Sequence, residues 1–278
     1  MRNQLVLTVA TLLALTTFIS AEPVSSIPPG ETQAKAVLDK SPRHGEWVDI
    51  TVTEGKPPIK SWIVYPERKD KAPVVIVIHE IFGESDWIRS VTDQLAADGF
   101  IAIAPDMLSG KGPNGGGTDS LADRKAVTGM VSSLKADEVM ANLNAVRAYG
   151  IKLPAADGKS ATIGFCWGGG MSFAYAAAQP ELNAAVVYYG TSPRDAAAYM
   201  KITCPVLGCY GKDDARVTAT IPPADEAMKK LGKSYVHHEY EGAGHGFLRA
   251  QADRNGANLK AAREAWGQTI AFLKEKTK

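Results

Sequence analysis

The amino-acid sequence predicts an α/β fold, in which helices cover both faces of a mostly parallel central sheet. The first observation is a set of short, continuous apolar runs such as Val74–Ile78, which are typical of strands buried on both faces of a sheet. The second is that these runs alternate with segments whose apolar residues recur at helical spacing. Strand–helix alternation with short connections makes successive strands parallel, and ligands then bind at the carboxyl ends of the strands.

Composition and charge are those of an ordinary globular protein and argue against a nucleic-acid partner. Of the 278 residues, 45% are hydrophobic and 22% are charged, which suffices for a sizeable core. The 31 basic side chains nearly match the 30 acidic ones, so the chain lacks the excess of positive charge that binds nucleic acid. We expect residues 43–278 to form one domain.

The first residues predict an exported protein. Arg2 precedes the apolar stretch Leu5–Leu15, and small residues ending at Ala21 complete the pattern of a secretory signal peptide over residues 1–21. We expect cleavage after Ala21 and a periplasmic or secreted protein without a membrane anchor. The alternative, an uncleaved membrane helix, is disfavoured because the apolar run is shorter than the ~20 residues that span a bilayer. Residues 22–42, rich in proline and serine, are interpreted as a linker that does not pack tightly.

The domain is predicted to begin with strands. Trp47–Val52 alternates apolar and polar residues and Ile59–Tyr65 follows it, which indicates an antiparallel pair. Val74–Ile78 is the first buried strand. Trp87–Asp98 has its apolar residues on one helical face and ends before a glycine, which predicts a helix. Phe100–Ala104 is then the next buried strand.

The rest of the chain repeats this alternation. Gly110–Gly117 is glycine-rich, but it contains a proline and lacks the Gly-Lys-Ser/Thr of a phosphate-binding loop, which indicates a flexible loop. A helix at Ala136–Tyr149 leads to the strand that ends in Phe165. The later elements are expected as strands at 184–189, 204–210 and 237–240, and as helices at 195–200, 224–231 and 256–276.

The segment Ala161–Gly170 carries the strongest functional signal. Its β-branched run ends in Gly-x-Cys-x-Gly around Cys166, and a small-residue segment follows, which is the layout of a nucleophile elbow with cysteine as the nucleophile. The glycines have a steric reason: the nucleophile lies in a strained strand-to-helix turn, where residues two before and two after it come too close for a Cβ. The alternative is a buried structural cysteine.

Two loops downstream supply an acid and a base for this cysteine. His245 lies in a glycine-rich loop after the last predicted strand, and Asp213 and Asp214 follow the strand before it. A cysteine nucleophile needs such a base and a group that orients it. The order nucleophile, acid, histidine is that of α/β-hydrolases. Three other histidines have no such context and are interpreted as packed or solvated side chains: His79, His237 and His238.

The chain contains three cysteines, so at least one thiol is unpaired. Cys204 and Cys209 lie on one predicted strand, where alternation and a rise of ~16 Å keep them from bridging each other. Both are interpreted as buried apolar residues. Cys166 is then a free thiol in an oxidising compartment, where a retained free thiol usually has a function.

These motifs together resemble the dienelactone hydrolase family, which comprises cysteine hydrolases of α/β-hydrolase fold. The resemblance spans roughly Val74–Lys274, and the combination of Glu-Ile-Phe-Gly with Gly-x-Cys-x-Gly-Gly makes it specific. It rests on the following segments: His79–Gly83, Pro105-Asp106, Gly164–Gly169, Tyr188–Gly190, Gly211–Asp214 with Val217, and Gly244–Phe247 with Arg249.

The resemblance implies roles for individual residues around the nucleophile. The family's acid follows a Gly-x-x-Asp pattern, which falls on Asp214, with Asp213 as the runner-up. The backbone N–H groups of Ile81 and Trp167 are implied to form the oxyanion hole, an arrangement that also fits the usual geometry of this fold.

The resemblance also implies how the thiol and the substrate are held. Glu80 is expected to contact the Cys166 thiol, because a neighbouring carboxylate disfavours the thiolate and protects the resting enzyme from oxidation. The family holds the carboxylate of its substrate with two arginines and a tyrosine. Arg249 matches one arginine and Arg124 is the candidate for the other, whereas the tyrosine position falls on Thr128. This departure puts dienelactone itself in doubt as the substrate.

The sequence thus predicts a hydrolase that opens a carboxylic ester or lactone through a thioester acyl-enzyme, with carboxymethylenebutenolidase-type activity within its range. The expected partner is a small, anionic ester or lactone, and no cofactor or metal is predicted. The alternative is a non-catalytic protein that keeps the fold and binds a ligand or senses redox state through its thiol. A burst of chromophore from an activated aryl ester distinguishes the two.

Overall fold

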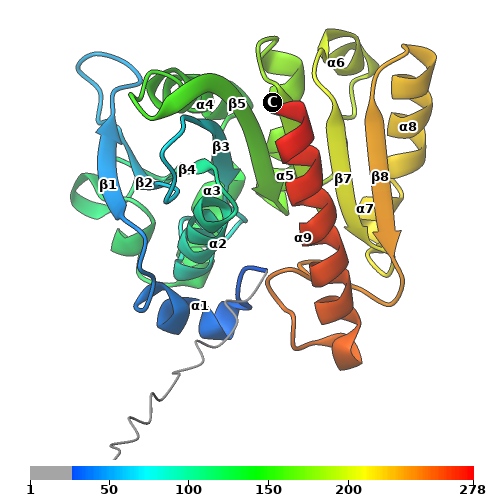
Figure 1. Ribbon diagram of the computed structural model, residues 1–278, viewed down its shortest axis with the longest axis horizontal. Helices are drawn as coiled ribbons and strands as arrows, with labels where there is room; N and C mark the ends of the chain where they lie inside the picture. Colours follow the sequence, from blue (N-terminus) through cyan, green and yellow to red (C-terminus); the bar gives the residue numbers. More distant parts are fainter. Residues whose placement is uncertain (1–26) are drawn as a thin grey trace, which may run out of the picture.

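A twisted sheet of eight strands runs through the computed structural model, which describes residues 27–278 (Figure 1). In chain order the strands are β1 (Gly45–Ile50), β2 (Ile59–Val64), β3 (Ala72–Ile78), β4 (Ile101–Pro105), β5 (Ala156–Phe165), β6 (Ala184–Tyr188), β7 (Val206–Gly211) and β8 (Tyr235–Tyr240). Their order across the sheet is β1-β2-β4-β3-β5-β6-β7-β8. β1 and β2 pair antiparallel, as do β2 and β4, and every other neighbouring pair is parallel.

The predicted α/β class with a mostly parallel sheet is confirmed. Every residue of β3 is buried, as its unbroken apolar run predicts, because helices cover both of its faces. β3 pairs with β5 from Val75 opposite Ala161 to Ile78 opposite Gly164. This register brings the ends of the two strands to the same edge of the sheet.

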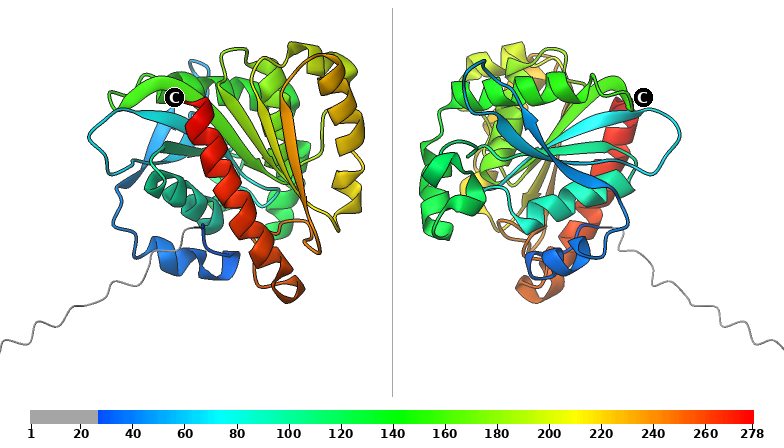
Figure 2. Two further views of the ribbon diagram at one scale, coloured as in Figure 1. Left: turned by 45° about the vertical axis from the view of Figure 1, so that its right-hand side comes forward. Right: turned by 90° about the vertical axis from the view of Figure 1, so that its left-hand side faces the viewer.

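Helices cover both faces of the sheet (Figure 2). A hydrophobic core lies between the helices and the sheet on each face. The core on one face is covered by α1 (Glu31–Leu38), α2 (Asp86–Ala97) and α9 (Ala257–Lys276). The core on the other face is covered by α4 (Ala136–Gly150), α5 (Trp167–Ala178), α6 (Ala196–Lys201) and α8 (Ile221–Lys230). Two further helices, α3 (Arg124–Ser133) and α7 (Ala215–Thr218), follow β4 and β7 near the carboxyl edge of the sheet.

The expectation of a loose linker over residues 22–42 is wrong for its described part. Residues 31–38 form α1, whose Ala34 is fully buried against the sheet-facing helices. The segment before the helix is fixed by the Trp87 indole, which donates a hydrogen bond to the Pro29 carbonyl at 3.1 Å. Proline, serine and glycine before residue 31 gave the impression of a linker, although the next eight residues favour a helix.

The other predicted elements differ from the observed ones by a few residues at their ends, and two further α-helices, α3 and α7, were not expected. α3 is capped by Asp123, whose side chain accepts a hydrogen bond from the Ala126 N–H at 2.8 Å. Cys204 lies before β7 and not within it, and all three cysteines are free.

Residues 1–21, the predicted signal peptide, lie outside the described residues. Between residues 27 and 278 no helix has the length and apolar character to cross a membrane.

Candidate active site

The residues singled out by the sequence meet at the carboxyl ends of four strands. Glu80 follows β3, Cys166 follows β5, Asp214 follows β7 and His245 follows β8. In Figure 1 the arrowheads of β5, β7 and β8 all point to the edge of the sheet beside which α1 lies. Parallel strands therefore bring together residues that are as far as 165 positions apart in the chain, from Glu80 to His245.

Cys166 occupies a strained turn between β5 and α5. Its backbone has φ 54° and ψ −114°, a conformation that L-residues rarely adopt and that costs of order 1–3 kcal/mol. A Cβ on Gly164 would lie 2.0 Å from the Gly168 carbonyl oxygen, and one on Gly168 would lie 2.2 Å from the Ile78 oxygen. Both glycines are therefore required by close backbone approach, and the turn presents the thiol at the N-terminus of α5.

A continuous chain of polar contacts joins the thiol to a buried carboxylate. Cys166 Sγ lies 3.1 Å from His245 Nε2, and His245 Nδ1 lies 2.5 Å from Asp214 Oδ2. The Asp214 side chain is only 7% exposed. Asp213 points away and forms an exposed ion pair with Arg254, whose Nη1 lies 2.7 Å from its Oδ2. The geometry thus places Asp214, and not Asp213, on the imidazole.

The His245 imidazole is poised to carry a proton. Burial by itself would lower its pKa, but the hydrogen bonds to Asp214 and Cys166 outweigh this effect and raise the pKa from 6.5 to about 9. The imidazolium is therefore the favoured form at neutral pH, and its positive charge lies 3.1 Å from Cys166 Sγ. The N-terminus of α5, the positive end of the helix dipole, directly follows the same residue.

Ile81 and Trp167 line the same cavity as Cys166. Trp167 is the first residue of α5, so its N–H has no partner within the helix. Within residues 27–278 the Ile81 N–H has no protein acceptor either. Two free N–H groups next to a nucleophile are what a developing oxyanion requires.

His79, which sequence reasoning treated as an ordinary packed histidine, supports this pair of N–H groups. It is fully buried; its Nδ1 lies 2.7 Å from the Glu80 carbonyl oxygen, and its Nε2 accepts the Met107 N–H at 3.3 Å. Burial lowers the pKa of His79, which fits a neutral ring that donates from Nδ1. The ring also stacks on Trp167, with centroids 5.3 Å apart. Its position directly before Glu80 and Ile81 was the only available signal in the sequence.

The Glu80 carboxylate is hydrogen-bonded to Arg249, whereas the resemblance led us to expect it beside the Cys166 thiol. Its Oε2 accepts a hydrogen bond from Arg249 Nε at 2.8 Å, and the described residues give no hydrogen bond between Glu80 and Cys166. Its other oxygen, Oε1, is buried without a hydrogen-bond partner, as is the Tyr189 hydroxyl. Burial raises the pKa of Glu80, and the Arg249 guanidinium opposes this shift. The hydrogen-bond partner of the Cys166 thiol is the His245 imidazole.

Arg249 and Arg124, which the resemblance assigns to the substrate carboxylate, both contact a carboxylate of this chain. Glu31 Oε2 lies 2.5 Å from Arg249 Nη1, and Glu31 Oε1 lies 3.1 Å from Arg124 Nη2. Both guanidinium groups stack on Phe82, at 3.6 Å for Arg124 and 5.0 Å for Arg249. Thr128, at the family's tyrosine position, bonds to the Arg124 carbonyl within α3 at 2.8 Å.

A cavity of about 310 Å³ opens beside the thiol. It is lined by Ile81, Cys166, Trp167, Gly170, Met171, Tyr189, Thr191 and Arg216. Arg216 was not predicted from the sequence; it is the charged residue of this lining, and it forms no ion pair with any described residue. Within residues 27–278 no group of three or more His, Cys, Asp or Glu side chains is arranged to hold a metal ion.

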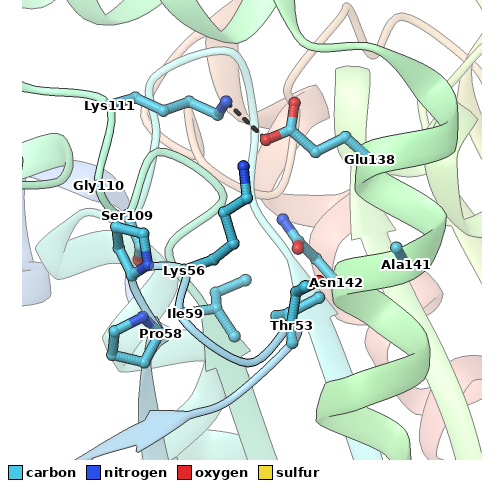
Figure 3. A pocket seen from close by; sticks show the side chains of 12 residues that line it. Thr53, Lys56, Pro58, Ile59, Ser109, Gly110, Lys111, Glu138, Ala141 and Asn142 are labelled. Atoms are coloured by element: carbon cyan, nitrogen blue, oxygen red, sulfur yellow. Dashed lines mark ion pairs between the residues drawn. The ribbon is translucent and has the colours of Figure 1, made fainter.

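A separate cavity of about 320 Å³ lies between the β1–β2 loop and α4 (Figure 3). Lys56, Lys111 and Glu138 face it, and the last two form an ion pair at 2.6 Å. It shares no lining residue with the cavity at Cys166. We therefore assign the reaction to the cavity of about 310 Å³, because Cys166 lines that cavity.

The sheet order and the strained cysteine elbow define an α/β-hydrolase whose nucleophile position is a cysteine. The chain belongs to the dienelactone hydrolase family, whose family model matches residues 59–277. A protein of Methylorubrum extorquens named "Putative carboxymethylenebutenolidase" is 30% identical over 271 residues, which cover 93% of this chain and 88% of that protein. A protein of the same name from Salmonella typhimurium is 31% identical over 221 residues, covering 75% and 79%.

The solved structures give the same result. The crystal structure of a "Putative Dienelactone Hydrolase" from Klebsiella pneumoniae superimposes with a TM-score of 0.71 at 27% identity, over 82% of this chain and 97% of that one. The chain is therefore a hydrolase of this family, and the predicted family and enzyme class are confirmed.

Proposed function

We propose that the protein hydrolyses a small carboxylic ester or lactone through a thioester acyl-enzyme formed on Cys166. The observation that carries the proposal is the unbroken line from Cys166 through His245 to Asp214, with contacts of 3.1 Å and 2.5 Å, at a strained elbow beside a cavity. Such a line supplies a nucleophile, a proton carrier and an orienting carboxylate in one geometry.

In the first step Cys166 Sγ attacks the carbonyl carbon of the substrate, and the C=O electrons move onto the oxygen. The negative oxygen is stabilised by the N–H groups of Ile81 and Trp167. When the tetrahedral intermediate collapses, the bond to the alcohol oxygen breaks, and His245 donates its proton to that oxygen. For a lactone the alcohol stays attached, so the acyl-enzyme carries the whole opened ring.

In the second step water attacks the thioester while His245 Nε2 accepts one of its protons. Collapse breaks the carbon–sulfur bond and returns the thiolate and the imidazolium, so the cycle ends in the starting protonation state. Asp214 keeps the His245 ring in one orientation and stabilises its positive charge. The products are a carboxylic acid and an alcohol, or a single hydroxy acid from a lactone.

The cavity supports a small substrate. Its volume of about 310 Å³ is at the lower end of the range for small-molecule sites, and Met171, Tyr189 and Trp167 give it an apolar wall. Arg216 supplies its unpaired cation. A compact acyl group of carboxymethylenebutenolidase type therefore fits better than a long acyl chain.

Activity and burst kinetics of Cys166→Ala test the proposal. The wild-type enzyme should release 4-nitrophenolate from 4-nitrophenyl acetate in a burst that is stoichiometric with Cys166, followed by steady turnover. Removing the nucleophile of a triad costs on the order of 10⁶ in kcat, so Cys166→Ala should show no turnover above background while it keeps the melting temperature. A variant with more than a tenth of the wild-type rate would refute the acyl-enzyme.

We further propose that the enzyme acts outside the cytoplasm after cleavage behind Ala21. Support comes from the charged, apolar and small-residue order of residues 1–21 in the sequence. N-terminal sequencing of the protein recovered from the periplasm or the medium should begin at Glu22. Recovery of the chain only from the cytoplasm with Met1 still present would contradict export.

A further inference from the structure

One carboxylate of the protein itself lies between the two arginines that the resemblance assigns to the substrate carboxylate. Glu31 is the first residue of α1, and each of its oxygens contacts a different guanidinium: Oε2 lies 2.5 Å from Arg249 Nη1 and Oε1 lies 3.1 Å from Arg124 Nη2. Phe82 stacks against both guanidinium groups. Two arginines, an aromatic support and a bridging carboxylate form a complete anion-binding arrangement.

The backbone holds Glu31 in this position. Its N–H donates a hydrogen bond to the Arg249 carbonyl at 2.9 Å, and the carbonyl of Pro29, two residues earlier, accepts one from the Trp87 indole at 3.1 Å. Glu31 therefore contacts the arginine through both its main chain and its side chain. A residue anchored twice keeps its carboxylate near the arginines without a large loss of side-chain entropy.

Arg249 connects the arginine pair to the loops that carry the predicted site residues. Arg249 lies four residues after His245, and its Nε holds Glu80, the residue before Ile81. The charges balance: Arg249 and Arg124 are two cations, and Glu31 and Glu80 are two carboxylates in contact with them. A substrate carboxylate entering here would be a third negative group, and it would have to displace Glu31 or pay for like-charge repulsion.

We propose that Glu31 is a built-in occupant of this anion site and that it sets the substrate class, excluding esters and lactones that carry a carboxylate at the arginine pair. This proposal rests on the proposed function, because Glu31 can select among esters and lactones only if the enzyme hydrolyses them. It predicts a substrate that is uncharged where it meets Arg249 and Arg124. The anionic substrate expected from the sequence is then not bound by these two residues.

The test compares the 4-nitrophenyl monoester of glutaric acid, which carries a free carboxylate, with its neutral methyl diester. Glu31→Gln keeps the shape of the side chain and removes its charge. The variant should raise kcat/KM for the anionic ester by about tenfold to a hundredfold, the range of one charge-assisted hydrogen bond. The neutral ester should change by less than about twofold, because no charge is involved.

Two controls assign the effect. Asp39→Asn, at the C-cap of the same helix, makes the same chemical change to an exposed carboxylate that pairs with Lys35, and it should alter neither rate. Adding Arg124→Gln to Glu31→Gln should remove most of the gain for the anionic ester, because the released cation is lost. Equal rate changes on both esters, or no change on either, would overturn the proposal and leave Glu31 as an anchor of α1.

A binding measurement separates this proposal from the catalytic one. In the Cys166→Ala background, monomethyl glutarate should raise the melting temperature more when Glu31 is also changed to Gln, since a ligand stabilises the state that binds it. If no ester is turned over by the wild-type enzyme, the proposed function fails, but this shift still tests Glu31. Equal shifts with and without the Glu31 substitution would overturn the proposal.

Discussion

Replacing Asp214 by asparagine should cost far more activity than the same change at Asp213, although the two residues are neighbours. Asp214 Oδ2 lies 2.5 Å from His245 Nδ1 and its side chain is 7% exposed, so its charge acts on the imidazole with little screening by water. Asparagine fits the same space, but its NH₂ group favours the wrong tautomer of the imidazole, a fault that lowers kcat by roughly 10⁴ in the best-studied triad.

Asp213 provides the matched control. Its carboxylate pairs with Arg254 at the surface, where both side chains are nearly half exposed, so Asp213→Asn should change kcat by less than about threefold. It cannot replace Asp214, because its side chain points away from His245. Steady-state release of 4-nitrophenolate from 4-nitrophenyl acetate, with melting temperatures as a check of folding, measures both variants. Similar losses in the two variants, or a larger loss in Asp213→Asn, would refute the assignment of the acid.

Two further predictions concern the histidines. The pKa of His245 is raised in the folded state from 6.5 to about 9, so its contribution to the free energy of unfolding is full below pH 6.5 and is lost as the pH rises through 9. Urea titrations at pH 6 and pH 10 should show this loss of stability in the wild-type enzyme and a smaller loss in Asp214→Asn. His79→Phe keeps the stack on Trp167 but removes the hydrogen bonds to Glu80 and Met107. The value of kcat should therefore fall by about tenfold to a hundredfold with little change in KM. A change in KM alone, with kcat intact, would show that His79 does not position the oxyanion donors.

The sequence was sufficient for the sheet and for the elbow, because both are written in local patterns. An unbroken apolar run such as β3 is stable only when both faces are covered, and Gly-x-Cys-x-Gly fits only a turn in which added Cβ atoms would meet backbone. Chain order then brings His245 and Asp214 to the same edge as Cys166. These inferences need no knowledge of side-chain packing, and the fold class and the family were confirmed.

The contacts that the sequence did not predict are ion pairs between side chains that lie far apart in the chain. Glu80 could be placed beside the nucleophile from its position after β3, but which of Cys166 and Arg249 it contacts depends on side-chain orientation in a buried space. Glu31 gave no signal, because it lies 218 residues from Arg249 in a segment whose prolines suggested a linker. His79 lies in a segment that carried the resemblance but was given no role, because the sequence does not show which histidine is buried and neutral.

The N-terminal helix has a consequence for how activity and selectivity are distributed along the chain. The family model matches residues 59–277, a range that contains Cys166, Asp214 and His245 but does not contain α1. The reacting groups thus belong to the shared body of the fold, whereas the charge presented to Arg249 and Arg124 comes from a segment in front of it. Under the role proposed for Glu31, a change confined to α1 would alter which substrate charges the site accepts while the elbow stays untouched, so substrate choice could evolve separately from the chemistry.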